Sequence, residues 1–271
     1  MTGAVADQAT GVAADRRVAV VTGAGRGIGR AISLELARNG FNVVLNYQSS
    51  SEGVSKTAAE IAGLGGAGVT IKGNVADPAT AASLVAAAES SFGPLDVWVN
   101  NAGVSTLAPV LETTAESMTH MTEVNFLGTF YGVQAAGRSM VDAGRGGAII
   151  NVASDLGLRA APLLAGYSAT KFAVVGLTQA AAVELAPAGI SVNAVCPGTV
   201  ETEMVQTEIE CEAGIRGVSG DEVRTALLDA VPAGRLCTAE DVSALVAWLT
   251  TSGAAFVTGQ AICTNGGSIL H

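Results

Sequence analysis

A glycine-dense turn near the start of the chain places the strongest constraint on its fold. Residues 18–22 read VAVVT, the turn from Gly23 to Gly29 reads GAGRGIG, and a helical pattern begins directly after it. Glycines in such a turn permit a tight bend, a close approach of backbone to a pyrophosphate, and close packing of helix on strand. The pattern predicts a nucleotide-binding βαβ unit, whereas an ordinary glycine turn remains the alternative while the turn is taken alone. No Gly-Lys-Ser/Thr ending follows, which excludes a P-loop.

Composition limits the class of protein. Of the 271 residues, 49% are hydrophobic and 14% are charged, so a large core can be buried and disorder is not expected. The formal net charge of −10 argues against nucleic acid and against an anionic membrane surface as partners. The mean hydropathy of +0.44 fits a sheet that is covered on both faces and helices buried between subunits, and therefore an oligomer.

The N-terminal residues and the cysteines indicate in which cellular compartment the protein works. Residues 1–15 have no basic start and no continuous apolar run, so we expect a flexible tail rather than a signal or transit peptide. The four cysteines are scattered without a CxxC pair, which favours reduced thiols in a cytoplasmic protein. Polar and glycine residues interrupt the uncharged stretch 242–270, which makes it a poor membrane span.

Strand and helix patterns alternate along the rest of the chain. We expect strands at 18–22, 41–46, 69–71, 95–99, 147–153, 191–195 and 260–263, and helices from about 30 and at 49–64, 77–92, 115–140, 166–185 and 239–249. This alternation predicts an α/β fold with a doubly wound parallel sheet. No linker divides the chain, so residues 16–271 are expected to form one catalytic domain with a mobile lid at about 200–236.

The residues at the strand ends are rich in Gly, Asn and Ser. They include Asn74 and Val75, the run Asn100 to Gly103, Ser154, and Pro197 with Gly198. Ligands of such sheets bind beyond the carboxyl ends of the strands, so these residues are expected to meet at one site together with the glycine turn.

Tyr167 and Lys171 lie four residues apart in a helical pattern and hence on one helix face. A nearby ammonium favours the phenolate form of a tyrosine, which would make Tyr167 a better acid–base group. Taken alone, the pair is more often an ordinary packed or solvated face, and Ser154 alone is more often a cap.

Together these motifs resemble the short-chain dehydrogenase/reductase family over about 17–267. The resemblance is carried by Gly23-x-x-x-Gly27-x-Gly29, Asn100-Asn101-Ala102-Gly103, Asn125, Ser154, Tyr167-x-x-x-Lys171 and Pro197-Gly198 in this order. It implies a single Rossmann-type domain with a seven-stranded parallel sheet, usually assembled as a homotetramer, and an NAD(P)-dependent oxidoreductase acting on a small carbonyl/alcohol substrate.

The resemblance also implies roles for particular residues. Tyr167 would be the acid or base, Lys171 would bind the nicotinamide ribose, Ser154 would bind the substrate oxygen, and Asn125 would hold a proton-relay water. Residues implied to bind the cofactor are Gly23, Arg26, Gly27, Ile28, Gly29, Tyr47, Gln48, Asn74, Val75, Asn101, Ala102, Gly103, Tyr167, Lys171, Pro197, Gly198, Val200 and Thr202.

Two positions depart from common patterns of the family. Asn74 stands where many relatives have aspartate, but its amide oxygen can still accept a hydrogen bond from adenine. Tyr47 stands where NAD-preferring members have an acidic residue for the ribose 2′-hydroxyl. With Arg26 nearby and the neutral donor Gln48 next in sequence, we expect NADP(H) to be favoured, while NAD(H) remains possible.

The substrate stays open at the level of sequence. Three short segments look like those of acetoin and polyol dehydrogenases and also like those of 3-oxoacyl carrier-protein reductases: KFAV at 171–174, GLTQ at 176–179 and ELAP at 184–187. A non-catalytic dinucleotide sensor is a third alternative. A hydrolase is excluded because no G-x-S-x-G elbow occurs. In the lid we expect Met204, Val205 and Ile209 to line the pocket and the acids to face water, with no basic anchor for an anionic substrate. We predict no metal site and structural roles for His120 and His271.

Overall fold

The computed structural model describes residues 16–270, so the tail predicted at 1–15 and His271 lie outside the described residues. One parallel sheet organises this part of the chain, with the strand order β3-β2-β1-β4-β5-β6-β7. Its strands are β1 (Arg17–Val21), β2 (Phe41–Tyr47), β3 (Gly68–Lys72), β4 (Val97–Asn100), β5 (Gly147–Val152), β6 (Ile190–Pro197) and β7 (Ala261–Thr264). The strands expected from the sequence are all present, with ends within two residues of the predicted ones.

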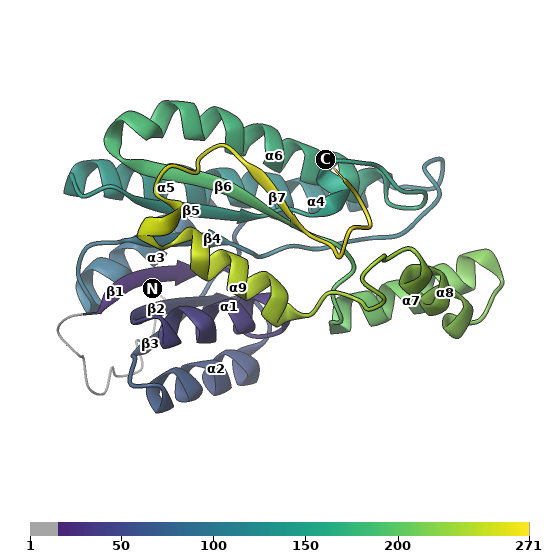
Figure 1. Ribbon diagram of the computed structural model, residues 1–271, viewed down its shortest axis with the longest axis horizontal. Coiled ribbons are helices and arrows are strands. Elements are labelled where there is room, and N and C mark those ends of the chain that lie inside the picture. The colour runs from purple at the N-terminus through teal and green to yellow at the C-terminus, as the bar shows by residue number, and fades with distance from the viewer. Residues whose placement is uncertain (1–15, 271) are drawn as a thin grey trace.

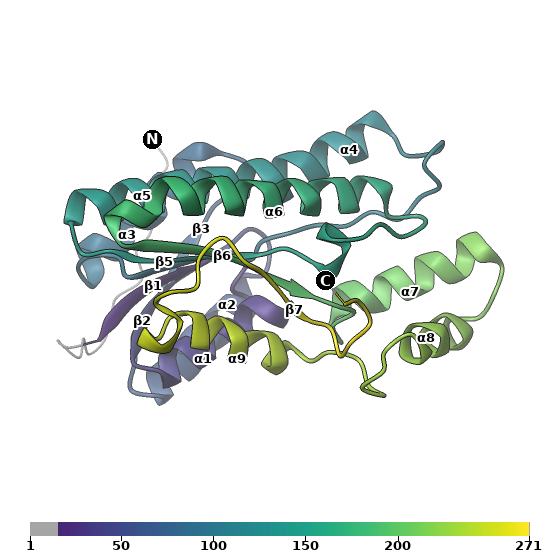
Figure 2. The same ribbon diagram turned by 45° about the horizontal axis from the view of Figure 1, so that its top comes forward.

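Helices cover both faces of the sheet, which confirms the doubly wound α/β fold. They are α1 (Gly27–Arg38), α2 (Ser51–Gly63), α3 (Pro78–Ser91), α4 (Ala115–Met121), α5 (Gly128–Ala143), α6 (Ala165–Leu185), α7 (Glu203–Arg216), α8 (Gly220–Asp229) and α9 (Ala239–Leu249), with short helical turns at Asp155–Gly157, Ala186–Ala188 and Ser252–Ala254. Figures 1 and 2 show α1, α2 and α9 on one face and α3, α4, α5 and α6 on the other.

The central strands are buried along almost their whole length because helices cover both faces. Ile32, Leu36 and Val246 belong to the core on one side of the sheet, and Leu84 and Met140 to the core on the other side. This burial explains why the strands read as continuous Val- and Ile-rich runs rather than as alternating patterns.

A buried chain of hydrogen bonds fixes α6 to the sheet. Trp98 Nε1 donates to Asn100 Oδ1 (2.7 Å), Asn100 Nδ2 donates to Asn151 Oδ1 (2.9 Å), and Asn151 Nδ2 donates to Thr178 Oγ1 on α6 (2.9 Å). Buried polar groups of this kind find their hydrogen-bond partners in only one register. These hydrogen bonds therefore fix the position of α6, the helix that carries Tyr167.

The expected continuous helix at 115–140 is wrong in one place. Between α4 and α5 the chain forms a π-helix, Thr122–Leu127. The wider π turn directs the buried Asn125 side chain toward a neighbouring loop, where Nδ2 donates to the Val104 carbonyl and Oδ1 accepts from the Val104 N–H, both at 2.8 Å. π-Helical turns within α-helices are frequent at functional sites.

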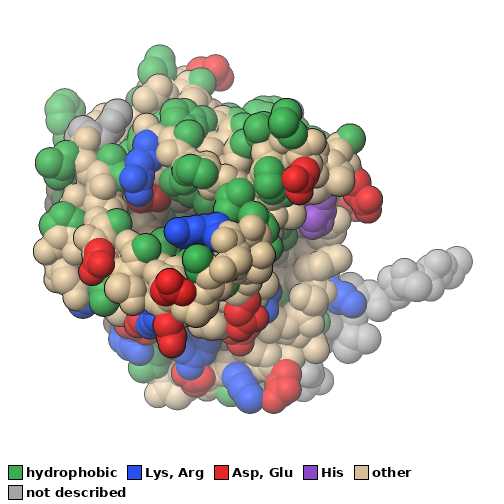
Figure 3. All heavy atoms as spheres, turned by 90° about the vertical axis from the view of Figure 1, so that its right-hand side faces the viewer, with side chains coloured by type: hydrophobic (Ala, Val, Ile, Leu, Met, Phe, Trp, Pro, Cys, Tyr) green, Lys and Arg blue, Asp and Glu red, His purple; other side chains and the backbone are tan. Residues whose placement is uncertain are grey.

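Beyond the carboxyl ends of the strands, α7 and α8 form a helical pair at the right-hand end of Figure 1. Both helices begin at a side-chain cap: Thr202 accepts from Val205 N–H, and Ser219 forms a capping box with Glu222. Seen from this end, charged side chains of both signs are interspersed, and hydrophobic ones gather in the upper half of the face (Figure 3). Within residues 16–270, no helix combines the length and the apolarity needed to cross a membrane.

Candidate active site

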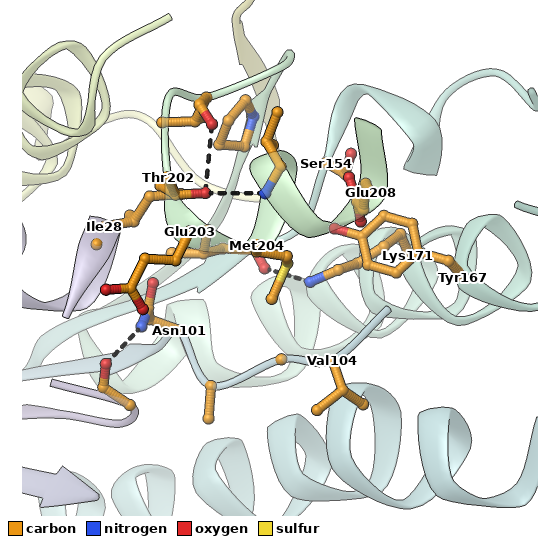
Figure 4. Close-up of a pocket in the computed structure, with 18 of the residues that line it drawn as sticks. Ile28, Asn101, Val104, Ser154, Tyr167, Lys171, Thr202, Glu203, Met204 and Glu208 are labelled. Carbon is orange, nitrogen blue, oxygen red and sulfur yellow. Dashed lines mark hydrogen bonds between the residues drawn. The ribbon is translucent and has the colours of Figure 1, made fainter. Parts of the chain in front are cut away.

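A cleft of about 1150 Å³ opens at the carboxyl edge of the sheet and is lined in part by residues of α7 (Figure 4). It begins where the chain's progression across the sheet reverses, between β1 and β4, the place at which ligands bind in open α/β sheets. The residues predicted to bind a dinucleotide all line it: Gly23, Arg26, Gly27, Ile28, Gly29, Tyr47, Gln48, Asn74, Val75, Asn101, Ala102, Gly103, Tyr167, Lys171, Pro197, Gly198, Val200 and Thr202. Ser154 lines it as well, whereas Asn125 is buried behind it.

The glycine turn is shaped for close contacts. Gly23 and Gly27 have φ values of +65° and +51°, a region that side-chain-bearing residues rarely adopt. A Cβ atom at Gly29 would collide with the Gly23 carbonyl oxygen and the Asn101 amide. Arg26, the residue before α1, makes no side-chain cap, so the first N–H groups of α1 remain available at the cleft. These features fit the pyrophosphate of a dinucleotide.

Arg26 does not extend freely toward the end of β2. Its Nη1 lies 2.9 Å from Glu203 Oε2 on α7, and both side chains are mostly exposed. The sequence had suggested Arg26 for a ribose 2′-phosphate but gave no sign of this ion pair. The pair connects the glycine turn directly to α7.

At the other end of the cleft, Ser154, Tyr167 and Lys171 lie together (Figure 4). Lys171 Nζ donates to the Val152 carbonyl at 2.9 Å and lies 5.5 Å from the centroid of the Tyr167 ring. Ser154 Oγ accepts from Leu156 N–H (3.1 Å) and donates to Asp155 Oδ1 (3.3 Å).

Asn125 lies close to the same lysine. A Cβ atom built on Gly103 would be 3.4 Å from Asn125 Oδ1 and 3.7 Å from Lys171 Nζ, so both polar atoms face Gly103. Asn125 Nδ2 also donates to Thr170 Oγ1 at 3.1 Å, which connects the π-helix to α6 one residue before Lys171.

The proton affinities of this group are shifted by burial. Burial raises the pKa of the Tyr167 phenol well above its usual value, and the Glu208 carboxylate adds to the rise. Burial also lowers the pKa of the Lys171 ammonium to about 8. In the protein alone the effect of burial on the Tyr167 pKa outweighs any help from Lys171, whose Nζ donates to the Val152 carbonyl.

Two further expectations about charged residues do not hold. Glu208 is half-buried in the lining of the cleft rather than facing water, whereas Glu203, which borders the cleft together with Glu201 and Glu212, has a mostly exposed side chain as expected. His120 borders the cleft and is exposed. Arg159 and Arg216 line a cleft that was expected to offer no basic anchor to an anionic substrate, although Asp155 and Glu212 pair with them. The docking angle of α7 decides which of its faces meets the cleft, and sequence spacing alone does not supply that angle.

Comparison with protein-family models decides the family. The model described as short chain dehydrogenase matches residues 17–213, most of the chain. The chain belongs to the short-chain dehydrogenase family. It is accordingly an NAD(P)-dependent oxidoreductase with a Rossmann-like fold. Among the described residues, no group of three or more His, Cys, Asp or Glu side chains is placed to hold a metal ion.

Relatives within the short-chain dehydrogenase family match nearly end to end. An L-2,3-butanediol dehydrogenase of Corynebacterium glutamicum is 40% identical, with 94% of this chain and 99% of the relative covered. A 3-oxoacyl-[acyl-carrier-protein] reductase of Staphylococcus aureus is 38% identical, with 93% and 98% covered. A variant of the actinorhodin polyketide ketoreductase, solved with NADPH, superposes with a TM-score of 0.90 at 37% identity, covering 95% of this chain and 98% of that one.

Proposed function

We propose that this short-chain dehydrogenase interconverts a small carbonyl compound and its secondary alcohol, with Tyr167 as the acid and base. The observation that carries the proposal is the meeting of Ser154, Tyr167 and Lys171 at one end of a cleft whose other end is the glycine turn. When bound, the nicotinamide dinucleotide supplies or accepts the hydride. The residues that would hold it are those of the glycine turn and the strand-end loops.

The protein's part is to bind the substrate oxygen and to move a proton. In reduction, Tyr167 Oη donates its proton to the oxygen that becomes the alcohol; in oxidation it accepts that proton. The raised pKa keeps the phenol protonated at neutral pH, which is the form that reduction requires. The Ser154 hydroxyl is the second hydrogen-bond donor for the same oxygen.

Lys171 and Asn125 support the proton transfer. The ammonium of Lys171 opposes the negative charge that remains on Tyr167 after donation. Lys171 Nζ and Asn125 Oδ1 both face Gly103, which supports a relay that returns a proton to the site through Lys171.

A 3-oxoacyl-thioester reductase is the second candidate, favoured by the 38% identity to the Staphylococcus aureus reductase. The mouth of the cleft argues against it. Besides Glu208, α7 carries Glu203, Glu210 and Glu212, against the single cation Arg216. This negative surface disfavours the phosphate-bearing arm that delivers such thioesters. The intact Ser, Tyr, Lys and Asn set likewise disfavours a non-catalytic sensor.

We propose that NADP(H) is preferred, while NAD(H) can be used. Tyr47 and Gln48 offer no carboxylate that would repel a 2′-phosphate, and both line the cleft near Arg26. The 2′-phosphate would take Arg26 from Glu203 in an exposed ion pair that contributes little by itself.

Assembly as a homotetramer, cytoplasmic location and lid movement complete the proposal. Phe172 and Val183 on α6 and Trp248 on α9 are exposed, which supports contacts between subunits through these helices.

The four cysteines are unpaired, in keeping with a reducing compartment. Residues 200–236 would act as the mobile lid because α7 and α8 extend away from the sheet.

The test is a label transfer. Two preparations of NADPH carry deuterium at one or the other transferable position of the nicotinamide, and each is incubated with the protein and acetoin. We expect mass spectrometry to find deuterium on the new carbinol carbon from one preparation and not from the other. Failure to transfer deuterium from either preparation, with acetoin and with a panel of diketones, ketoesters, sugars and acyl thioesters, would contradict the proposal.

A further inference from the structure

Glu208 is a glutamate on the inner side of α7 that the proposed reaction does not use. It lines the cleft together with Tyr167 and Ser154, and Figure 4 shows its side chain pointing toward the end where these two residues lie. The next residue, Ile209, is buried against α8 and Ala213 one turn further on is buried as well, which fixes the rotation of α7 about its axis. Glu208 is therefore held at the substrate end of the cleft.

Glu208 differs from the other carboxylates of the lining in having no cation beside it. Four of the lining acids form ion pairs: Asp155 with Arg159, Glu201 with Arg224, Glu203 with Arg26, and Glu212 with Arg216. Within residues 16–270, Glu208 has no Lys, Arg or His nitrogen within ion-pair distance. A carboxylate in such a place lacks the compensation that burial of charge requires unless a bound group donates hydrogen bonds to it.

A second polar group lies near Glu208. The Ser105 hydroxyl is buried and has no hydrogen-bond partner within the described part of the chain. It is close enough to favour the charged form of Glu208, which opposes the rise in the pKa of that carboxyl caused by burial. Ser105 does not line the cleft, so its hydroxyl can serve Glu208 alone, whereas Glu208 does line it. A carboxylate accepts several hydrogen bonds, so Glu208 keeps acceptor capacity for a ligand hydroxyl that donates to it.

We propose that Glu208 binds a hydroxyl group on the carbon next to the reacting carbonyl, so that vicinal hydroxyketones and diols are the preferred substrates. This inference rests on the proposed function. Ser154 and Tyr167 bind the reacting oxygen, and Glu208 accepts a hydrogen bond from the neighbouring hydroxyl. A site that is built to hydrogen-bond a hydroxyl discriminates against the analogue that lacks it, because its own polar groups then stay unpaired. The negative charge also disfavours substrates with a carboxylate at that position.

The experiment compares acetoin with butanone, which lacks the hydroxyl, in the wild type and in Glu208→Gln. We expect the wild type to favour acetoin. In the variant, kcat/KM for acetoin should fall about 10- to 100-fold, the usual weight of a hydrogen bond to a charged group, while that for butanone should stay within about threefold. Glu208→Asp, which keeps the charge, should recover part of the loss for acetoin.

Glu210→Gln is the matched control. Glu210 is exposed on the same helix, and among the residues that the structure describes it accepts a hydrogen bond from Gln206 alone, so both substrates should keep their wild-type kcat/KM. Equal losses for acetoin and butanone in Glu208→Gln, or no loss for either, would overturn the inference. A wild type that reduces both ketones equally well overturns the inference alone, whereas one that reduces no carbonyl compound overturns the proposed function and the inference with it.

Discussion

At the scale of single residues, Arg26 and Glu203 decide how the cofactor-binding end of the cleft is charged. Their ion pair spans 2.9 Å between the glycine turn and the start of α7, and both side chains are mostly exposed. Arg26 is the one cation among the lining residues near the end of β2 that can meet a 2′-phosphate, and Glu203 competes for it. The two residues should therefore act in opposite directions on the choice between NADPH and NADH.

Substitution of the two residues tests this opposition. Arg26→Ala should raise KM for NADPH about 10- to 100-fold and KM for NADH less than about threefold, since only the phosphate loses a charge-assisted bond. Glu203→Gln should lower KM for NADPH by up to about fivefold, the range of an exposed ion pair. Arg30→Ala is the control, because Arg30 lies in the first turn of α1, close to Arg26 in sequence, but pairs with Glu60. Equal changes for both cofactors in Arg26→Ala, or a higher kcat/KM for NADH in the wild type, would refute the preference.

At the scale of elements, local signals predicted most of the fold. Valine-rich runs that end at Gly, Asn or Pro set the strand ends within two residues, and the expected helix at 239–249 matches α9. The π-helix that contains Asn125 could not be predicted, because its wider turn is stabilised by hydrogen bonds to Val104, a residue 21 positions away in sequence. Patterns read along the chain do not report such long-range contacts.

The same limit applies to the site. Residues of the glycine turn and of the strand ends were found because topology alone brings them to one edge of the sheet. Glu208 was placed wrongly because its position depends on how α7 docks. The ion pairs of Glu201 and Glu203 could not be predicted either, since their arginines come from other segments of the chain.

At the scale of the whole molecule, exposed apolar side chains on α6 and α9 point to assembly. Val183 is 78% exposed, and Phe172 and Trp248 are nearly half exposed. Large exposed apolar side chains on helices commonly mark subunit contacts, because their burial removes apolar area from water. The proposed homotetramer would cover them.

Light scattering tests the assembly. We expect a mass of four chains for the wild type at micromolar concentration, and a smaller species for Val183→Glu, whose charge would be buried at the contact without a partner. Leu64→Glu is the control, since Leu64 is partly exposed at the end of α2, away from α6 and α9. A monomer mass for the wild type would rule out the tetramer.

The central claim is that Tyr167 transfers the proton in a nicotinamide-dependent carbonyl reduction, and a single substitution tests it most directly. Tyr167→Phe keeps the ring and removes the transferable proton, so kcat for reduction should fall about 10²- to 10⁴-fold, while NADPH binding, followed by fluorescence, stays unchanged. Tyr131→Phe removes a hydroxyl from a tyrosine on α5 whose ring packs against Phe130, and it should leave kcat unchanged. A Tyr167→Phe enzyme that reduces its substrate at nearly the wild-type rate would contradict the account.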